Sequence, residues 1–347
     1  MTAASDIAAC KELLRGGSRT FFAASLVLPR AVSEPAIALY AFCRLADDAV
    51  DLDGGRLDAV ERLRDRLDRA YAGQPLPSPA DRAFAEVVER FAIPRELPEA
   101  LLEGLAWDAE GRRYETLDDL VDYAARVAGA VGAMMSLLMR RRDPAVVARA
   151  CDLGIAMQLT NIARDVGEDA RAGRLYLPMQ WLREAAVDPE AWLAHPRYDM
   201  RIGKVIGRML AVADTFYQRS IAGVGALPGS CRPGIHAARL IYAEIGRELE
   251  RGGLDSVSRR AVVPGSRKLR LLTEAFARAF GAHDAVTDDV EPAVRFLVSA
   301  VASSRPAVAP VPSRPRRKSA VEQAVWVLDL FERLERREQL LRTGDTS

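Results

Sequence analysis

Apolar side chains recur at steps of three and four residues along most of the chain, while alternating β-branched runs between hairpin turns are nearly absent. That period is typical of helices that bury one face, whereas a half-buried strand alternates every second residue. Stretches rich in proline, glycine or other turn-forming residues divide the pattern at residues 28–35, 51–55, 73–80, 93–98 and 227–234. The pattern therefore predicts an all-α protein in which these stretches are joints between helices and not domain boundaries.

The C-terminal part of the chain departs from this pattern. Residues 301–319 are rich in proline and arginine, which is typical of an extended linker. Residues 320–343 then form a predicted amphipathic helix with a charged end and with an apolar face of Val321, Ala324, Val325, Leu328 and Phe331. We expect one helical domain over residues 1–300 and a C-terminal helix that packs on it or lies in solvent. Contact with a membrane surface through the basic linker is the alternative.

Composition and charge narrow the function classes. The chain has 347 residues and is 49% hydrophobic, which is enough for a large core or pocket. Its 49 basic and 48 acidic side chains leave a net charge of +1, so no overall field attracts nucleic acid. The four cysteines are far apart, and neither H-E-x-x-H nor G-x-S-x-G occurs. We therefore do not expect a zinc site, a disulfide framework, a zinc protease or a serine hydrolase.

No segment predicts export or a membrane span. The N-terminal residues are interrupted by Asp6, Lys11 and Glu12, unlike a secretory signal. The most apolar run, residues 130–139, is too short and too glycine-broken to cross a bilayer. We therefore expect a cytoplasmic protein, with peripheral contact at the inner membrane as the alternative.

Two predicted helices carry acidic faces with nearly the same spacing. On the first, the positions i, i+4, i+7 and i+11 are Tyr40, Arg44, Asp47 and Asp51. On the second, the positions i, i+3, i+7 and i+11 are Gln158, Asn161, Asp165 and Asp169. Such steps place each set along one helix face. A lone aspartate pair is ordinarily a solvated surface, but each face continues backward into uncharged sequence, residues 36–43 and 153–160. This predicts carboxylates at the mouth of a buried cavity.

Magnesium is the metal that suits two such faces. An EF-hand calcium loop is excluded because Ala49 and Val60 stand at its first and twelfth positions, where carboxylates are needed. Magnesium takes few protein carboxylates and completes its octahedron with water and phosphate oxygens, so a heavily phosphorylated substrate is expected between the faces. Guanidinium groups match phosphate geometry. The basic side chains that could contact such a substrate are Arg44, Arg164, Arg171, Arg259, Arg260, Arg267 and Lys268.

Several long segments in a fixed order carry a family resemblance. They are GSRTFFAASLVLPR, ALYAFCRLADDAVD, YAARVAGAVGAMM, AMQLTNIARDVGEDARAGRLYLP and ARLIYAEIGRELERGGLDSVSRRAVVPGSRK, and they span roughly residues 10–275. The chain resembles the squalene and phytoene synthases, the head-to-head isoprenoid synthases, and within them the bacterial phytoene synthases. The resemblance implies an all-α isoprenoid synthase fold, a single helical bundle around a central cavity with both aspartate motifs at its mouth.

The resemblance also assigns roles to individual residues. The implied metal ligands, with Asp48 as a helper, are Asp47, Asp48, Asp51, Asn161, Asp165 and Asp169. The implied diphosphate contacts are Ser18, Thr20, Arg44, Asn161, Arg164, Tyr242 and Arg260, and Tyr242 is counted with the aspartates as catalytic. The implied hydrocarbon channel is Phe21, Tyr40, Tyr123, Val127, Ala128, Gly132, Met135, Gln158 and Leu159. Ordinary helix packing is the alternative for its apolar members. One departure is Ala124, Ala125 and Arg126, where related enzymes often have a second tyrosine and a cysteine.

The activity implied is a 1'-2-3 condensation of two geranylgeranyl diphosphates to phytoene, via prephytoene diphosphate, in carotenoid biosynthesis. The implied cofactor is magnesium, or manganese in its place, and no NADPH is expected because G-x-G-x-x-G is absent. The final proton acceptor is either the released diphosphate or a tyrosine. The alternative activity is a dehydrosqualene or presqualene diphosphate synthase that uses farnesyl diphosphate. A non-catalytic helical scaffold is a third hypothesis, which the two intact aspartate motifs disfavour. Downstream carotenoid enzymes are the expected protein partners.

Overall fold

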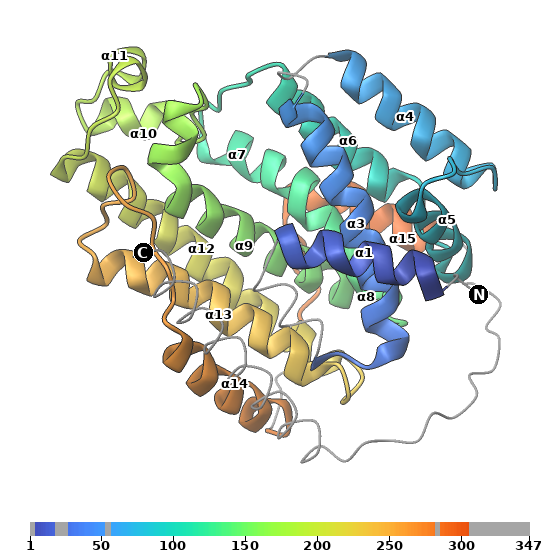
Figure 1. The fold of residues 1–347 in the computed structure, drawn as a ribbon. Helices are drawn as coiled ribbons and strands as arrows, with labels where there is room; N and C mark the ends of the chain where they lie inside the picture. The colour runs from blue at the N-terminus through green and yellow to red at the C-terminus, as the bar shows by residue number, and fades with distance from the viewer. Residues whose placement is uncertain (1–3, 18–26, 53–56, 282–284, 305–347) are drawn as a thin grey trace, which may run out of the picture.

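In the computed structural model the described residues are 4–17, 27–52, 57–281 and 285–304, without the side chains of 15–17, 47–52 and 57–58. Within these residues the chain forms helices and no β-strand (Figure 1). The elements are α1 (Ala4–Gly17), α3 (Arg30–Leu52), α4 (Leu57–Tyr71), α5 (Pro79–Phe91), α6 (Glu96–Ala109), α7 (Leu117–Ala124), η1 (Ala125–Gly129), α8 (Ala130–Leu138), α9 (Pro144–Arg171), α10 (Met179–Glu184), α11 (Pro189–Ala194), α12 (Met200–Ala226), α13 (Arg232–Arg251), α14 (Gly265–Ala279), η2 (Pro292–Val294) and α15 (Arg295–Ser303). The predicted all-α architecture is confirmed.

The long helix α9 is the centre of the bundle. It packs along α12 and also contacts α8, η1 and α13. Its start follows from local sequence, because the Asp143 side chain accepts hydrogen bonds from the backbone N–H groups of Ala145 and Val146, and Pro144 occupies the first turn. The next long helix, α12, begins in the same way at Asp199, whose side chain accepts from the N–H groups of Arg201 and Ile202. Both central helices are therefore specified at their N-termini by a capping aspartate.

Glycines allow α9 to approach its neighbours closely. A Cβ added to Gly132 on α8 would collide with the carbonyl of Ala150, and one added to Gly154 on α9 would collide with the carbonyl of Ala128. Only glycine fits such backbone contacts without moving a helix. The small residues in this part of the sequence therefore determine how close α8 and α9 lie.

The helix that runs from α7 through η1 to α8 is the one candidate for a membrane span within the described residues. Its span Leu117–Leu138 is long and apolar enough to cross a membrane by length and composition, but 67% of its most apolar window is buried inside the bundle. That burial is typical of a core helix. The element η1 is a π-helical turn inside it, a feature that often marks functional sites.

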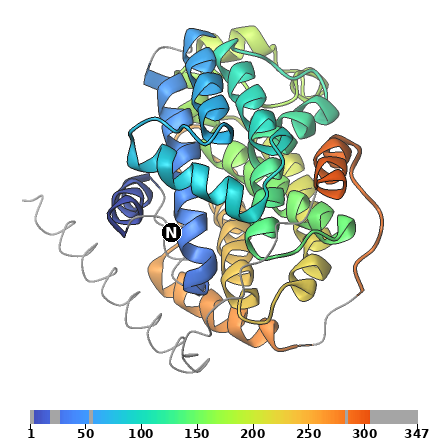
Figure 2. The ribbon, with the colours of Figure 1, turned by 90° about the vertical axis from the view of Figure 1, so that its right-hand side faces the viewer.

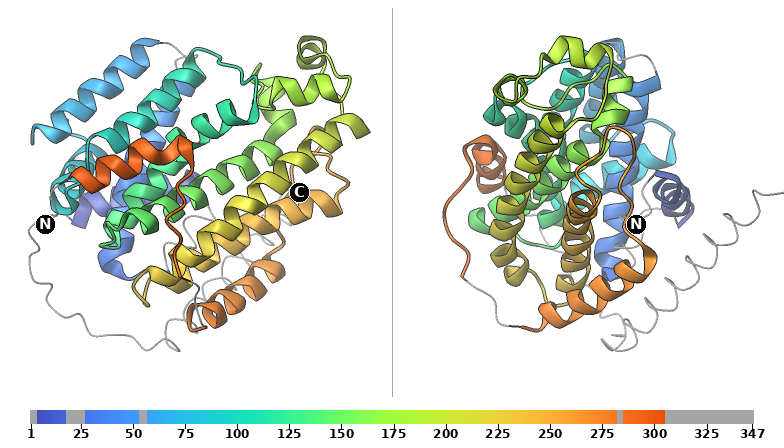
Figure 3. Two further views of the ribbon diagram at one scale, coloured as in Figure 1. Left: turned by 180° about the vertical axis from the view of Figure 1, so that it is seen from behind. Right: turned by 90° about the vertical axis from the view of Figure 1, so that its left-hand side faces the viewer.

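The last described segment lies on the outside of the bundle. Figure 3 (left), the view from behind, shows the stretch that leads to α15 crossing in front of the long helices, and Figure 2 shows α15 at the edge. Leu297, Val298 and Val301 of α15 are buried against α6, α8 and α9. The helix ends at Ser303, three residues beyond the expected domain end at residue 300. The expected helix at 320–343, and all of the expected linker beyond residue 304, lie outside the described residues.

Candidate active site

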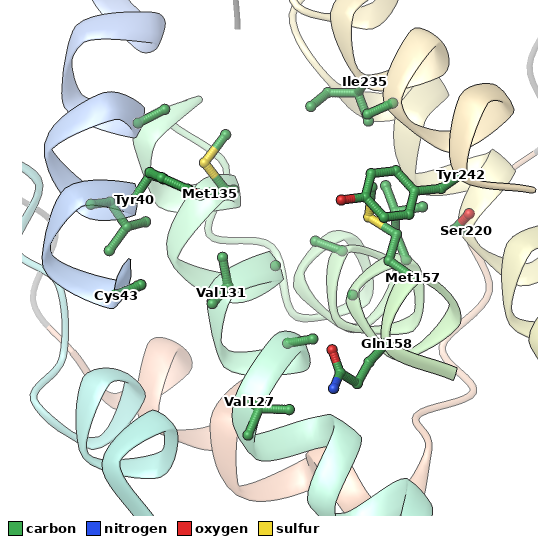
Figure 4. Close-up of a pocket in the computed structure, with 18 of the residues that line it drawn as sticks. Tyr40, Cys43, Val127, Val131, Met135, Met157, Gln158, Ser220, Ile235 and Tyr242 are labelled. Carbon is green, nitrogen blue, oxygen red and sulfur yellow. The ribbon is translucent and has the colours of Figure 1, made fainter. Parts of the chain in front are cut away.

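A cavity of about 410 Å³ lies between α3, α6, η1, α8, α9, α12 and α13. Figure 4 shows Tyr40 and Cys43 of α3 on one side, facing Ile235 and Tyr242 of α13 on the other. Most of the lining is apolar, and polar groups are few. An apolar pocket with a few convergent polar groups is the usual form of a small-molecule site.

Most of the predicted site residues whose side chains are described line this cavity. Those that do are Tyr40, Arg44, Tyr123, Val127, Ala128, Gly132, Met135, Gln158, Asn161 and Tyr242. They come from four separate elements, α3, the α7 to α8 helix, α9 and α13, which the fold brings together. The cavity thus brings together predicted site residues from segments up to about two hundred residues apart in the sequence.

Among the predicted channel residues whose side chains are described, Leu159 is the exception, and its predicted position in the channel is wrong. It is fully buried in the core and does not line the cavity. Successive residues on a helix point about 100° apart, and the cavity face of α9 runs through Gly154, Met157, Gln158 and Asn161. Leu159 therefore packs against neighbouring helices instead.

The second aspartate motif forms an ion cluster near the polar end of α9. Arg164 Nε donates to Asp165 Oδ1 at 2.8 Å, and Arg260 Nε donates to the same oxygen at 2.8 Å. Burial alone would raise the pKa of Asp165, but the hydrogen bonds and charges of the two arginines outweigh it and lower that pKa below its ordinary value. Asp165 is therefore ionised at neutral pH with two guanidinium groups beside it.

Asp169, one turn further along, behaves differently. Burial, with the charge of Asp165 adding to it, raises the pKa of Asp169 to about 7. The Asn161 side chain lies two turns before it, and its carbonyl oxygen Oδ1 is buried without a hydrogen-bond partner in the described structure. An orphaned carbonyl oxygen and a carboxylate short of compensating charge are groups that a bound divalent cation would satisfy. The residues of this face therefore fit the predicted metal.

The first aspartate motif is described only by its backbone. Asp47, Asp48 and Asp51 lie in the last turns of α3, so the predicted helix is confirmed, and Tyr40 and Arg44 earlier on α3 line the cavity. Ser18, Thr20 and Phe21 lie outside the described residues. Among the side chains that are described, no group of three or more His, Cys, Asp or Glu is arranged to hold a metal ion. The roles of these six residues stay predictions.

Comparison with known proteins decides the family. The squalene/phytoene synthase family model matches residues 14–267 of this chain. The chain belongs to the squalene/phytoene synthase family. The phytoene synthase of Cereibacter sphaeroides is 56% identical over 321 residues, which cover 88% of this chain and 90% of that protein. The phytoene synthase of Rhodobacter capsulatus is 57% identical over 278 residues, which cover 79% of this chain and 82% of that protein.

Solved structures of this family have the same fold. A dehydrosqualene synthase in complex with a ligand superposes with a TM-score of 0.72 at 30% identity, over 79% of this chain and 96% of that one. A squalene synthase from Alicyclobacillus acidocaldarius gives a TM-score of 0.66 at 25% identity, over 72% of this chain and 94% of that one. The predicted isoprenoid synthase fold is confirmed.

Several residues that line the cavity were not predicted from the sequence. Met157 follows Gly154 on the cavity face of α9, and extending the spacing backward from Asn161 would have found it. Arg149, Ser220 and Ile235 also line the cavity, and no motif marks them. Asp108, near the end of α6, is the remaining polar lining residue that was missed, and no motif distinguishes it from the three glutamates on the same helix.

Proposed function

We propose that this protein is a phytoene synthase that condenses two geranylgeranyl diphosphates head to head and releases diphosphate. Two relatives named phytoene synthase, 56% and 57% identical over most of the chain, support this substrate. The observation that carries the proposal is the apolar cavity whose polar end holds Arg44 and Asn161 on the same helices as the two aspartate motifs. Such a site suits a ligand with a long hydrocarbon and a diphosphate.

The polar end is suited to holding the leaving group. Arg164 and Arg260 lie beside Asp165, and guanidinium groups match the oxygens of a diphosphate. When bound, magnesium supplies Lewis-acid stabilisation of the negative charge that develops on the leaving group. Its proposed ligands are Asp47, Asp51, Asn161, Asp165 and Asp169, with Asp48 as a helper. Ser18, Thr20 and Tyr242 complete the proposed diphosphate contacts.

The apolar wall protects the other product of ionisation, an allylic carbocation. Met135, Val127 and Val131 line the cavity and exclude water from it. The rings of Tyr40, Tyr123 and Tyr242 also line it, and aromatic faces attract a cation. The cation is thereby kept for attack by the double bond of the second prenyl diphosphate. Phe21 is proposed to extend this lining.

Product length tests the proposal directly. The purified protein is incubated with magnesium and either labelled geranylgeranyl diphosphate or labelled farnesyl diphosphate, and hydrocarbons are then extracted. A C40 hydrocarbon from the C20 substrate is expected. A C30 product alone would move the assignment to a dehydrosqualene or presqualene diphosphate synthase, and turnover of neither substrate would overturn both activities.

The chemistry of the product also bears on where in the cell the enzyme works. Phytoene is a hydrocarbon that water does not dissolve, so its release is favoured at a bilayer surface or directly to the next carotenoid enzyme. We therefore place the protein in the cytoplasm with peripheral contact at the inner membrane. Sedimentation of the protein with vesicles in the presence and absence of product measures that contact.

A further inference from the structure

Three tyrosine rings stack beside the cavity wall. Tyr114 lies in the loop before α7, Tyr123 lies on α7, and Tyr176 lies in the segment after α9. The ring centroids of Tyr123 and Tyr176 are 5.4 Å apart, and those of Tyr114 and Tyr123 are 5.2 Å apart. Of the three, only Tyr123 lines the cavity. The stack therefore joins three separate segments at one place on the wall.

The three tyrosines differ in whether their hydroxyls donate a hydrogen bond to Asp108. The hydroxyl of Tyr123 donates to Asp108 Oδ2 at 2.8 Å, and the hydroxyl of Tyr176 donates to Asp108 Oδ1 at 2.7 Å. The hydroxyl of Tyr114 is buried and has no hydrogen-bond partner within the described structure. One carboxylate therefore fixes two of the rings, while the third is held by packing alone.

The position of Asp108 gives this arrangement a chemical consequence. Asp108 itself lines the cavity, and its negative charge contributes to the raised pKa of Asp169 in the second aspartate motif. Burial, with the charge of Asp108 adding to it, raises the pKa of Tyr123 well above its ordinary range, so its hydroxyl stays a donor. A phenol that donates to a carboxylate carries more negative charge on its oxygen and ring, because linked hydrogen bonds polarise one another. That polarisation strengthens the attraction of the ring for a cation.

We propose that Asp108 is a positioning residue that fixes and polarises Tyr123 at the cavity wall, and that Tyr176 completes its hydrogen bonding. The role rests on the proposed function, because the group that Tyr123 would stabilise is the carbocation formed from the prenyl diphosphate. Asp108 acts through Tyr123 and needs no contact with substrate. It stabilises the cationic transition state and contributes little to binding of the ground-state diphosphate.

The test compares variants that keep the shape of the cluster. Asparagine has the same size as aspartate, but its amide nitrogen cannot accept a hydrogen bond. In Asp108→Asn one tyrosine hydroxyl therefore loses its acceptor. We expect kcat for C40 hydrocarbon to fall by roughly 10²-fold with KM for geranylgeranyl diphosphate little changed. Tyr123→Phe should give a similar fall, and Asp108→Asn combined with Tyr123→Phe should cost no more than either change alone, because the two residues act as a unit.

Tyr114→Phe is the matched control. It removes a hydroxyl from the same stack without removing a hydrogen bond, so kcat and KM should stay at the wild-type values. Tyr176→Phe removes one of the two bonds to Asp108 and leaves the carboxylate and the cavity wall in place. It should lower kcat by a smaller factor than Asp108→Asn, and it provides the decisive measurement if Asp108→Asn fails to fold by circular dichroism.

The outcomes separate this role from the proposed function. A wild-type protein that makes no hydrocarbon would overturn the proposed function, whatever the variants do. An active wild type with Asp108→Asn or Tyr176→Phe at the wild-type kcat would overturn the positioning role alone. The positioning role would also be overturned if the fold losses in kcat of the two single variants multiply in the double variant. It would likewise be overturned if Asp108→Asn raises KM and leaves kcat unchanged.

Discussion

Asp152 and Asp165 lie thirteen residues apart on α9, and each forms an ion cluster with two arginines. The two clusters differ in burial and in the role that each can serve. Asp152 is 0% exposed and lies 2.9 Å from Arg149 and 3.2 Å from Arg219. Asp165 is 16% exposed at its side chain, and its partner Arg260 is 53% exposed. Burial raises the pKa of Asp152 to about 6 although both arginines oppose it, whereas at Asp165 the arginines outweigh burial and the pKa is lowered.

The partners of the two clusters explain their different roles. Arg149 donates to Thr287 Oγ1 at 3.1 Å and to the carbonyl of Asp289, and Arg219 donates to Glu291 at 3.0 Å. The Asp152 cluster therefore fastens the segment before α15 onto α9 and α12. The arginines of the Asp165 cluster are bound to Asp165 near the polar end of the cavity, Arg260 also lies 3.7 Å from Glu168, and both arginines have donors left for an incoming anion. One aspartate with two arginines serves architecture in one place and, in the proposed function, ligand binding in the other.

The largest expected effect is the loss of activity in Asp165→Asn. Removing one charge from the proposed metal face should lower turnover by on the order of 10²- to 10³-fold, since preorganised charge at the leaving group is lost. Helix content by circular dichroism should stay at the wild-type level, because Asp165 is partly exposed. Asp47→Asn should act in the same way. Turnover retained in both variants would refute the metal assignment.

Asp152→Ala should have the opposite profile. Removing Asp152 takes its carboxylate away from the buried Arg149 and leaves Arg219 with Asp289 and Glu291, which costs about 3–5 kcal/mol in the free energy of unfolding. Urea unfolding followed by circular dichroism measures this loss. The kcat of the molecules that stay folded should change little at low temperature. A variant as stable as the wild type would mean that Asp152 does not fasten the outer segment.

Substituting one arginine in each cluster should have smaller effects than substituting the aspartates. Arg260→Ala should raise KM for the prenyl diphosphate about tenfold, which corresponds to one charge-assisted hydrogen bond. Its unfolding free energy should change by less than about 0.5 kcal/mol, since Arg260 is largely exposed. Arg219→Ala should leave KM unchanged and lower the unfolding free energy. Equal KM values for the two variants would contradict the assigned roles.

The smallest effect is a pH dependence that involves Asp169. The folded-state pKa of this group is raised from 3.8 to about 7, so its contribution to stability is complete below pH 3.8 and is lost as pH rises through about 7. Magnesium should offset that loss, because the cation favours the ionised carboxylate. The gain in melting temperature on adding magnesium should thus be larger at pH 8 than at pH 6. Asp169→Asn should have nearly equal gains at both pH values, and an unchanged pH dependence in that variant would exclude Asp169 as the titrating group.

Some of this site was predictable because helix geometry is local. The steps between Gln158, Asn161, Asp165 and Asp169 place them on one face of any α-helix, whatever surrounds it. The capping aspartates Asp143 and Asp199 are likewise local signals. The period of the apolar residues predicted the all-α fold for the same reason.

Long-range packing decided the rest of the site. Leu159 was placed in the channel by resemblance, but the rotation of α9 within the bundle turns it into the core. Asp108 carries no motif, and its partners Tyr123 and Tyr176 come from separate segments. Contacts of this kind depend on how α6, α7 and α9 pack, which periodicity along one helix does not specify.

The sequence by itself determined that the protein is helical, that two helices carry paired aspartate faces, and which family its motifs resemble. Those properties follow from 3.6 residues per turn and from short ordered motifs. Only the tertiary structure decided that Asp152 lies in a buried cluster while Asp165 lies near the cavity, and that Asp108 binds two tyrosines. Burial and partner choice arise when separate helices pack together, and the free energy of a charge depends on both.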